Sequence, residues 1–477
     1  MGSAGMNVEA VLQSNLGSIV APAGCGKTHL ITETLAVKNR KPVLVLTHTT
    51  AGVSALKRRL RRLSVPTSHY VVTTIDGWSL RIANSFPMSC PIQSSPDNPR
   101  QFYPELRQSV LRFMITGCIG EIIKASYSRL LVDEYQDCDV NQHNLILTLS
   151  QVLPTVIFGD PMQCIFDFAG RMPDWQNDVQ SRFPSLGLLN TPWRWNNVGA
   201  PELGEWVLAA RETLLQGGNV DLLTCPAHVV WYQLTGVAYS DPINQHNAQQ
   251  TILNQYPHDS LLVIGDSINE QSRHKFAQSS YSTQVVEQVQ LSHVTDAAKL
   301  FDSTNEIDLV EAILHVSSSM ITNVEKVQTL RRIATILNGR NRTPPTIIEQ
   351  ALVDVVSDNN RNNILNALQA LELKQGSRVY RRSAYNALKD SISLAISSPN
   401  KSMHEASTII REQLRQKGDK RIPKRAIGST LLLKGLEADH CLILDANARG
   451  MNSKHLYVAL SRGAKSVTIF ARNNLIG

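Results

Sequence analysis

Short apolar runs that end in small or polar residues alternate with amphipathic stretches in the first 200 residues. Residues 16–38, LGSIVAPAGCGKTHLITETLAVK, predict a strand, a glycine turn and a helix, and residues 41–60 repeat this order. Two further apolar runs, RLLVDEYQD (129–137) and TVIFGDPMQ (155–163), end in polar residues. Strands that alternate with helices and carry polar residues at their carboxyl ends are typical of a parallel α/β sheet.

The same alternation of strands and helices returns after residue 200. One inserted segment precedes it, and a second inserted segment interrupts it. Residues 84–104 are rich in Pro and Ser and predict a loop within an inserted segment of the first core. AHVVWYQL (227–234) and DSLLVIGDS (259–267) predict strands, residues 290–420 predict helices throughout, and strand–helix–strand patterns close the chain. The fold class is therefore α/β, with two parallel-sheet cores that each hold an insertion, the second all-helical.

This pattern divides the chain into six segments. They are the first core in two parts (6–78 and 126–199) around a small insertion (79–125), and the second core in two parts (200–289 and 425–477) around a helical insertion (290–424).

Composition narrows the class of protein. Charged residues make up 18% and hydrophobic residues 42% of the 477 residues, which is typical of a globular chain. No apolar run approaches the roughly 18 residues of a membrane helix, so we expect no membrane contact. Seven scattered cysteines, none in CxxC spacing, favour a reducing, cytoplasmic location over zinc or disulfide chemistry.

The charge is weakly informative. The net charge is +7, and basic residues cluster in LKRRLRRL (56–63) and REQLRQKGDKRIPKR (411–425). Each cluster is either a solvated face or a surface for a polyanion.

The octapeptide APAGCGKT (21–28) carries the first candidate chemistry. A strand that feeds a small-residue loop and then a helix presents backbone N–H groups to an anion. We expect Ala23, Gly24, Cys25 and Gly26 to cradle phosphates, Lys27 to reach the β and γ phosphates, and Thr28 to coordinate magnesium. The first position needs only a small residue, which Ala21 satisfies.

Polar residues at the ends of the next two apolar strands complete a hydrolytic site. Asp133 is predicted to hold magnesium and Glu134 to orient and deprotonate the attacking water. Gln163 ends the segment Gly-Asp-Pro-Met-Gln (159–163) and is placed to bridge the γ-phosphate to a second ligand. A solvated acidic strand end is the alternative for the two acids, and the apolar residues before them argue against it.

Taken in order, the phosphate loop, DEYQD and GDPMQ resemble superfamily-one DNA helicases of the UvrD/Rep/PcrA type. Later segments fit the same resemblance: THTTAGVSALKRRL (47–60), TTIDGW (73–78), TPWRW (191–195), LLLKGLEADHCLILD (431–445) and YVALSRGAKS (457–466). The resemblance implies two RecA-like cores, with ATP and Mg²⁺ bound between them.

The resemblance also implies roles for individual residues. Trp193 would stack on adenine, Arg194 and Arg462 would be arginine fingers, and Glu437 would lie at the junction of nucleotide and DNA. The residues implied in contact with single-stranded DNA are Thr47, Thr49, Thr74 and Phe168.

The chain departs from the family pattern at three points. No glutamine stands about twenty residues before Lys27, and Gln13 is the nearest candidate to read adenine. The usual aromatic-Gly-Trp-Arg becomes FDFA (166–169), and Leu431 replaces a usual histidine. These departures indicate weaker or partner-dependent engagement of DNA.

Two functions follow from the resemblance. The first is an ATP-dependent helicase or translocase on single-stranded DNA, with 3′-to-5′ polarity by family analogy. The second is an ATPase that senses DNA ends or strands and regulates a partner nuclease. For the second, the compact size and motif layout resemble the helicase subunit of Gabija anti-phage systems, which works with an OLD-family nuclease.

Overall fold

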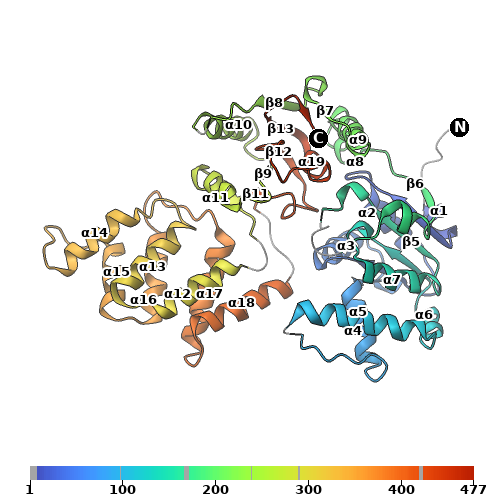
Figure 1. The fold of residues 1–477 in the computed structure, drawn as a ribbon, viewed down its shortest axis with the longest axis horizontal. Helices are drawn as coiled ribbons and strands as arrows, with labels where there is room; N and C mark the ends of the chain where they lie inside the picture. Colours follow the sequence, from blue (N-terminus) through green and yellow to red (C-terminus); the bar gives the residue numbers. More distant parts are fainter. Residues whose placement is uncertain (1–7, 97, 166–170, 238, 288–290, 418–422) are drawn as a thin grey trace. The chain divides into compact units, whose positions relative to one another are not determined.

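The computed structural model describes residues 8–96, 98–165, 171–237, 239–287, 291–417 and 423–477 (Figure 1). The chain forms two compact units. The first comprises residues 1–232, 451–467 and 473–477, and the second comprises residues 233–450 and 468–472. The division into six segments remains a prediction.

A six-stranded sheet forms the centre of the first unit. Its strand order is β3-β2-β4-β5-β1-β6, and all five pairs of neighbours run parallel. The strands are β1 (Leu16–Val20), β2 (Val43–Thr47), β3 (Tyr70–Thr74), β4 (Arg129–Val132), β5 (Thr155–Gly159) and β6 (Ser185–Leu188). Every residue of β2, β4 and β5 is buried, which explains their continuous apolar sequences.

A second six-stranded sheet has the order β10-β11-β9-β12-β13-β8, and the pairs from β10 to β12 run parallel. The strands are β8 (Val229–Gln233), β9 (Leu261–Ile264), β10 (Gln284–Val285), β11 (Arg425–Gly428), β12 (Ala438–Ile443) and β13 (Gly463–Ala471). A short antiparallel pair joins β7 (Val220–Asp221) to β14 (Leu475–Ile476). The predicted α/β fold with two RecA-like parallel sheets is confirmed.

Helices connect and cover the strands. The α-helices described before residue 280 are α1 (Val8–Gln13), α2 (Lys27–Ala36), α3 (Thr50–Arg62), α4 (Ile75–Ser85), α5 (Pro99–Ile115), α6 (Gly120–Ser126), α7 (Val140–Ser150), α8 (Trp193–Asn196), α9 (Pro201–Leu215), α10 (Ser240–Gln255) and α11 (Glu270–Ser279). The last helix, α19 (Ser453–Leu460), belongs to the first unit. Among the described residues, no helix is long and apolar enough to cross a membrane.

The loop predicted for residues 84–104 is wrong over its last six residues. Helix α5 begins at Pro99, because proline fits the first helical position, where its missing N–H costs nothing. Phe102 and Leu106 then face the core on the same side of this helix, and this burial outweighs the proline at position 104.

The predicted helical insertion consists of helices packed around one hydrophobic core. They are α12 (Ser292–Ser303), α13 (Glu306–Ser318), α14 (Lys326–Leu337), α15 (Ile347–Ser357), α16 (Arg361–Glu372), α17 (Arg382–Ser397) and α18 (Met403–Lys417). A single β-bridge, Ile321 with Val379, is the only extended pairing among the described residues of this stretch.

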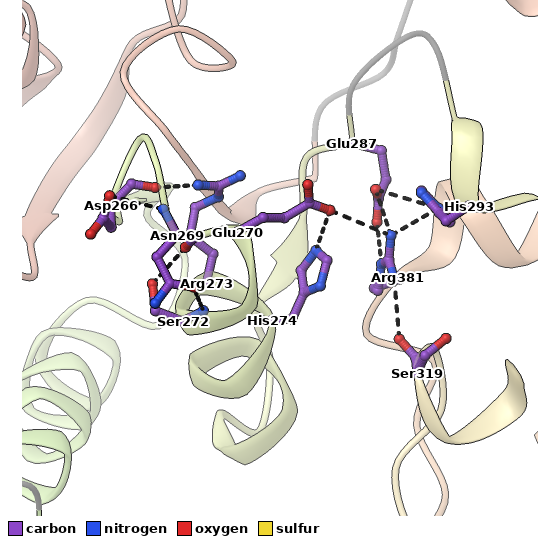
Figure 2. Close-up of polar contacts among 10 residues, drawn as sticks. All are labelled: Asp266, Asn269, Glu270, Ser272, Arg273, His274, Glu287, His293, Ser319 and Arg381. Atoms are coloured by element: carbon purple, nitrogen blue, oxygen red, sulfur yellow. Dashed lines mark hydrogen bonds and ion pairs between the residues drawn. The ribbon is translucent and has the colours of Figure 1, made fainter. Parts of the chain in front are cut away.

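A buried arginine joins this helical part to the sheet of the second unit (Figure 2). Arg381, which precedes α17, donates from Nε to Glu287 Oε1 over 2.6 Å and from Nη2 to Glu287 Oε2 over 3.0 Å. Glu287 follows β10, and both side chains belong to residues that are 4% exposed. The same Nη2 lies 2.8 Å from His293 Nε2 and 3.9 Å from Glu270 Oε1. Carboxylate and imidazole atoms of Glu270, Glu287 and His293 gather within 4.8 Å of one another, and the guanidinium supplies their cation.

Two histidines beside this guanidinium generate a pH dependence. Burial and the positive charge of Arg381 together lower the pKa of His274 and of His293 to about 4. The unfolded chain, with a histidine pKa of roughly 6.5, binds more protons than the folded chain between these two values. The free energy of unfolding that the two neutral histidines contribute is therefore fully present above pH 6.5 and is lost as the pH falls toward 4. At pH 5 the loss relative to neutral pH is about 2 kcal/mol per histidine.

We expect the melting temperature of the second unit, measured by calorimetry on the full chain, to fall on acidification from pH 7 to 5. The His274→Gln/His293→Gln double variant should show a flatter dependence on pH, because its folded and unfolded states no longer differ in these protons. His258→Gln, at an exposed histidine of the same unit, is the control. Equal slopes for the wild type and the double variant would contradict the prediction.

Candidate nucleotide site

The loop between β1 and α2 has the backbone of an anion cradle. Ala21 continues the sheet by donating its N–H to the carbonyl of Gly159 over 2.8 Å. Gly24 and Gly26 then adopt φ angles of 74° and 90°, which only glycine takes without strain. Helix α2 begins directly after them, at Lys27, so its free N–H groups face the loop.

Close neighbours also restrict these glycines. A Cβ on Gly24 would lie 2.8 Å from Arg194 Cβ and from the Trp195 ring, and a Cβ on Gly26 would lie 3.0 Å from Trp193. Cys25 is buried between them, and burial raises the pKa of its thiol to about 12. It is therefore a neutral, inert side chain in the loop.

Lys27 lies between the two carboxylates that follow β4, whereas the sequence predicted contacts of all three residues with the nucleotide, magnesium or water. Its Nζ is 3.0 Å from Asp133 Oδ1 and also pairs with Glu134 Oε1. Burial alone would lower the pKa of Lys27, but the two carboxylates outweigh it and raise the pKa, so the ammonium is retained. Burial raises the pKa of Asp133, and Lys27 opposes this shift.

The backbone of Glu134 turns its carboxylate away from the strand. Its φ of 57° is left-handed, an unusual conformation for a residue with a side chain. The side chain is 34% exposed, and Oε2 accepts from Gln136 Nε2 over 2.6 Å. Gln136 in turn accepts from the N–H of Asp160 over 3.1 Å. This bond links the segment that carries Asp133 and Glu134 to the end of β5.

Gln163 lies at the end of a short 3₁₀ turn, Pro161–Gln163. Asp160 holds this turn twice: Oδ1 accepts from the N–H of Met162 over 3.1 Å, and Oδ2 accepts from Gln163 Nε2 over 3.1 Å. The amide predicted to contact the γ-phosphate is thus oriented by a buried carboxylate.

Both predicted arginine fingers lie in the first unit and contact the end of α19. Arg194 donates from Nη1 to the carbonyl of Ser461 over 2.5 Å, and its N–H bonds to the carbonyl of Gly24 over 3.1 Å. Arg462 is 2% exposed and donates to the carbonyl of Val458 and to Ser461 Oγ, each over 2.9 Å. Arg194 is thereby next to the phosphate loop, and Arg462 is folded onto its own helix.

Trp193, predicted to stack on adenine, borders a cavity of 510 Å³ beside the loop. The cavity is lined also by Glu9, Gly26, His29, Glu33 and Leu189, and Trp193 is 51% exposed. Gln13, the nearest candidate to read the base, donates instead to Glu9 Oε1 over 2.8 Å. Glu9 is therefore the polar residue of α1 that borders the cavity.

The remaining predicted residues have separate positions. Thr28 is the second residue of α2 and is partly exposed. Thr49 and Thr74 cap α3 and α4, and their hydroxyls accept from Gly52 and Gly77. Thr47 ends β2 and is only 1% exposed, whereas the exposed Glu437 belongs to the second unit. Phe168 lies outside the described residues, and all these binding roles remain predictions.

Sequence analysis missed two residues of this site, Arg211 and Tyr457. Arg211 lies on α9 and ion-pairs with Asp160 over 2.7 Å, and Tyr457 accepts from the N–H of Ala23 over 2.9 Å. Arg211 carried no local signal, because two neighbouring charges, Arg211 and Glu212, among the apolar residues of WVLAARETLL are usual in a surface helix. Tyr457 stood inside a quoted segment, where only Arg462 was assigned.

Comparisons with known proteins agree with a nucleotide-binding domain in the first third of the chain. A family model described as "AAA domain" matches residues 6–169. A search of curated proteins finds no match. Among solved structures, the helicase nonstructural protein 10 of an arterivirus, determined with DNA, aligns with a TM-score of 0.28 and 10% identity. The alignment covers 58% of this chain and 55% of that one, just over half of each. The domain match supports the predicted ATPase of the helicase P-loop type.

Trp193→Ala should weaken the binding of a fluorescent ATP analogue by roughly tenfold, because a base loses a stacking partner worth about 1–3 kcal/mol. Trp193→Phe should retain most of the affinity, since it keeps an aromatic face. Tyr281→Ala, at an exposed residue of the second unit, serves as the control in the same fluorescence titration. Wild-type affinity in Trp193→Ala would contradict the placement of the base in this cavity.

Proposed function

We propose that this protein hydrolyses ATP at the site formed by the phosphate loop, Asp133, Glu134 and Gln163. One observation carries the proposal: the partly buried ammonium of Lys27 lies between Asp133 and Glu134, directly at the start of α2. A cation held beside free helix N–H groups attracts phosphate, and the adjacent carboxylates supply a metal ligand and a base.

The donor set fits ATP with Mg²⁺. The backbone N–H groups of residue 24 and residues 26–28 would hold the phosphates, while Asp133 and the Thr28 hydroxyl offer the oxygen ligands that Mg²⁺ prefers. When bound, Mg²⁺ neutralises the charge that develops on the phosphoryl oxygens.

The chain's own residues would then exchange partners. Lys27 is paired with Glu134, so a phosphate that draws Lys27 away leaves the Glu134 carboxylate available to accept a proton from water. Its left-handed backbone and the bond from Gln136 fix the direction of this carboxylate. Gln163, held by Asp160, would orient the γ-phosphate, and Arg194 would add a cation next to the loop.

We further propose that hydrolysis drives 3′-to-5′ movement on single-stranded DNA in the cytoplasm. Supporting this are helix α3, whose Arg58, Arg59, Arg61 and Arg62 are exposed, and the seven free thiols, which suit a reducing compartment. The alternative is an ATPase that senses DNA ends for a partner nuclease of the OLD family, as in Gabija-type anti-phage defence. The missing arginine in FDFA (166–169), which favours weak engagement of DNA, motivates it.

Lys27→Ala and Glu134→Gln should separate binding from hydrolysis. Loss of the ammonium should weaken nucleotide binding and lower the hydrolysis rate by at least about 100-fold. Loss of the base should lower the rate by about 10²–10⁴-fold while binding of ATP persists. Phosphate release and nucleotide titration measure the two effects, with exposed Glu121→Gln as the control. A Lys27→Ala protein that hydrolyses ATP at the wild-type rate would end this proposal.

The decisive test of the finer proposal is the ATPase rate of the full chain with and without single-stranded DNA. A motor should be stimulated several-fold, and the stimulation should weaken between about 50 and 200 mM salt because phosphate contacts release counterions. Unwinding of a duplex with a 3′ overhang, but not a 5′ overhang, is expected from the polarity. An ATPase that stays silent until an OLD-family nuclease is added would instead favour the sensor.

A further inference from the structure

A buried ion pair lies behind the 3₁₀ turn that carries Gln163. Asp160 Oδ1 accepts from Arg211 Nη2 over 2.7 Å and from Arg211 Nε over 3.1 Å. Asp160 is 1% exposed and Arg211 is 5% exposed, so water does not compete for these bonds. Asp160 directly follows β5, and Arg211 lies on α9, 51 positions later in the sequence.

The two carboxylate oxygens of Asp160 have different hydrogen-bond partners. Oδ1 receives Arg211 and the N–H of Met162, while Oδ2 receives the side-chain amide of Gln163. Two guanidinium nitrogens and the N–H of Met162 converge on Oδ1, so the carboxylate group cannot turn without breaking these bonds. The position of Oδ2, and with it the amide of Gln163, therefore depends on Arg211.

The same guanidinium extends toward the phosphate loop. Arg211 Cζ lies 6.0 Å from the centre of the Tyr457 ring, within the range of a cation–π contact. Burial raises the pKa of Tyr457 well above its usual value, so its hydroxyl stays protonated. That hydroxyl accepts from the N–H of Ala23. Arg211 thus contacts residues that support both Gln163 and the phosphate loop.

Stability alone gives this ion pair a poor rationale. Replacing a buried ion pair with apolar residues of similar volume is often neutral or stabilising, because the desolvation of both charges offsets their attraction. Helix α9 already buries Leu203, Val207, Ala210 and Leu214 around Arg211. What an apolar residue at 211 could not supply is the orientation of Asp160.

We propose that Arg211 is a positioning residue for ATP hydrolysis, which acts through Asp160 to orient Gln163 toward the γ-phosphate. The inference rests on the proposed ATPase function. It predicts that loss of Arg211 slows turnover in the same way as loss of Gln163, without weakening nucleotide binding.

The test compares steady-state ATPase kinetics of the full chain with Arg211→Met, Arg211→Lys, Gln163→Ala and the Arg211→Met/Gln163→Ala double variant. Arg211→Met keeps the volume of the side chain and should lower kcat by about 10–100-fold, with the Kd for ATP changed less than threefold. The double variant should be no slower than Gln163→Ala alone, because both changes remove one interaction. Arg211→Lys should recover part of the loss through a single contact with Asp160.

The controls distinguish the possible failures. Glu205→Gln, at an exposed residue of the same helix, should turn over ATP at the wild-type rate. A merely structural role would lower the melting temperature of Arg211→Met and leave its kcat unchanged, or give losses that multiply in the double variant; either result overturns the inference. Should Arg211→Met fail to fold, Asp160→Asn and Arg211→Lys carry the same comparison. A wild type without ATPase activity, or one equalled by Lys27→Ala, would instead refute the proposed function.

Discussion

The pairing of Lys27 with Asp133 and Glu134 is the interaction on which the first unit depends. A partly buried lysine needs opposite charge, and the two acids provide it because the carboxyl ends of β1 and β4, with β5 between them, lie at one edge of the sheet. The parallel order of the sheet brings these strand ends to one edge. The fold and the chemistry of the site are therefore linked by one electrostatic requirement.

The residues of this edge could be predicted from the sequence, because each follows a continuous apolar strand. The phosphate loop, the two acids and Gln163 all lie just after such strands. Apolar runs of this kind also predicted the two sheets. Arg211 did not, since its partner Asp160 is 51 residues away and nothing nearby distinguishes it from a surface charge. The loop assigned to residues 99–104 failed for a different reason: the count of prolines outweighed the apolar spacing of Phe102 and Leu106, although burial decides the structure.

Among the described residues, each unit has a buried arginine that donates from two nitrogens to one carboxylate group. Arg211 holds Asp160 in the first unit, and Arg381 holds Glu287 in the second, across 94 residues of sequence. In both cases the arginine comes from a helix or its start and the acid follows a strand. Such pairs add little net stability, but they tolerate only one arrangement of the elements they join. The second pair also explains why a cluster of two glutamates and a histidine does not need an ion: Arg381 occupies its centre.

The cations of the candidate site share a further property that bears on how it would work. Lys27 pairs with two acids, Arg194 with the carbonyl of Ser461, and Arg462 with the carbonyl of Val458 and the hydroxyl of Ser461. A triphosphate that binds as proposed would compete with protein oxygens for each of them, and the gain on binding would be the difference between two sets of contacts. Because Arg194 and Arg462 both bond to the end of α19, an exchange of their partners would free the same backbone turn, residues 458–461. On the proposed function, nucleotide binding and the conformation of this turn would be coupled through shared hydrogen-bond partners.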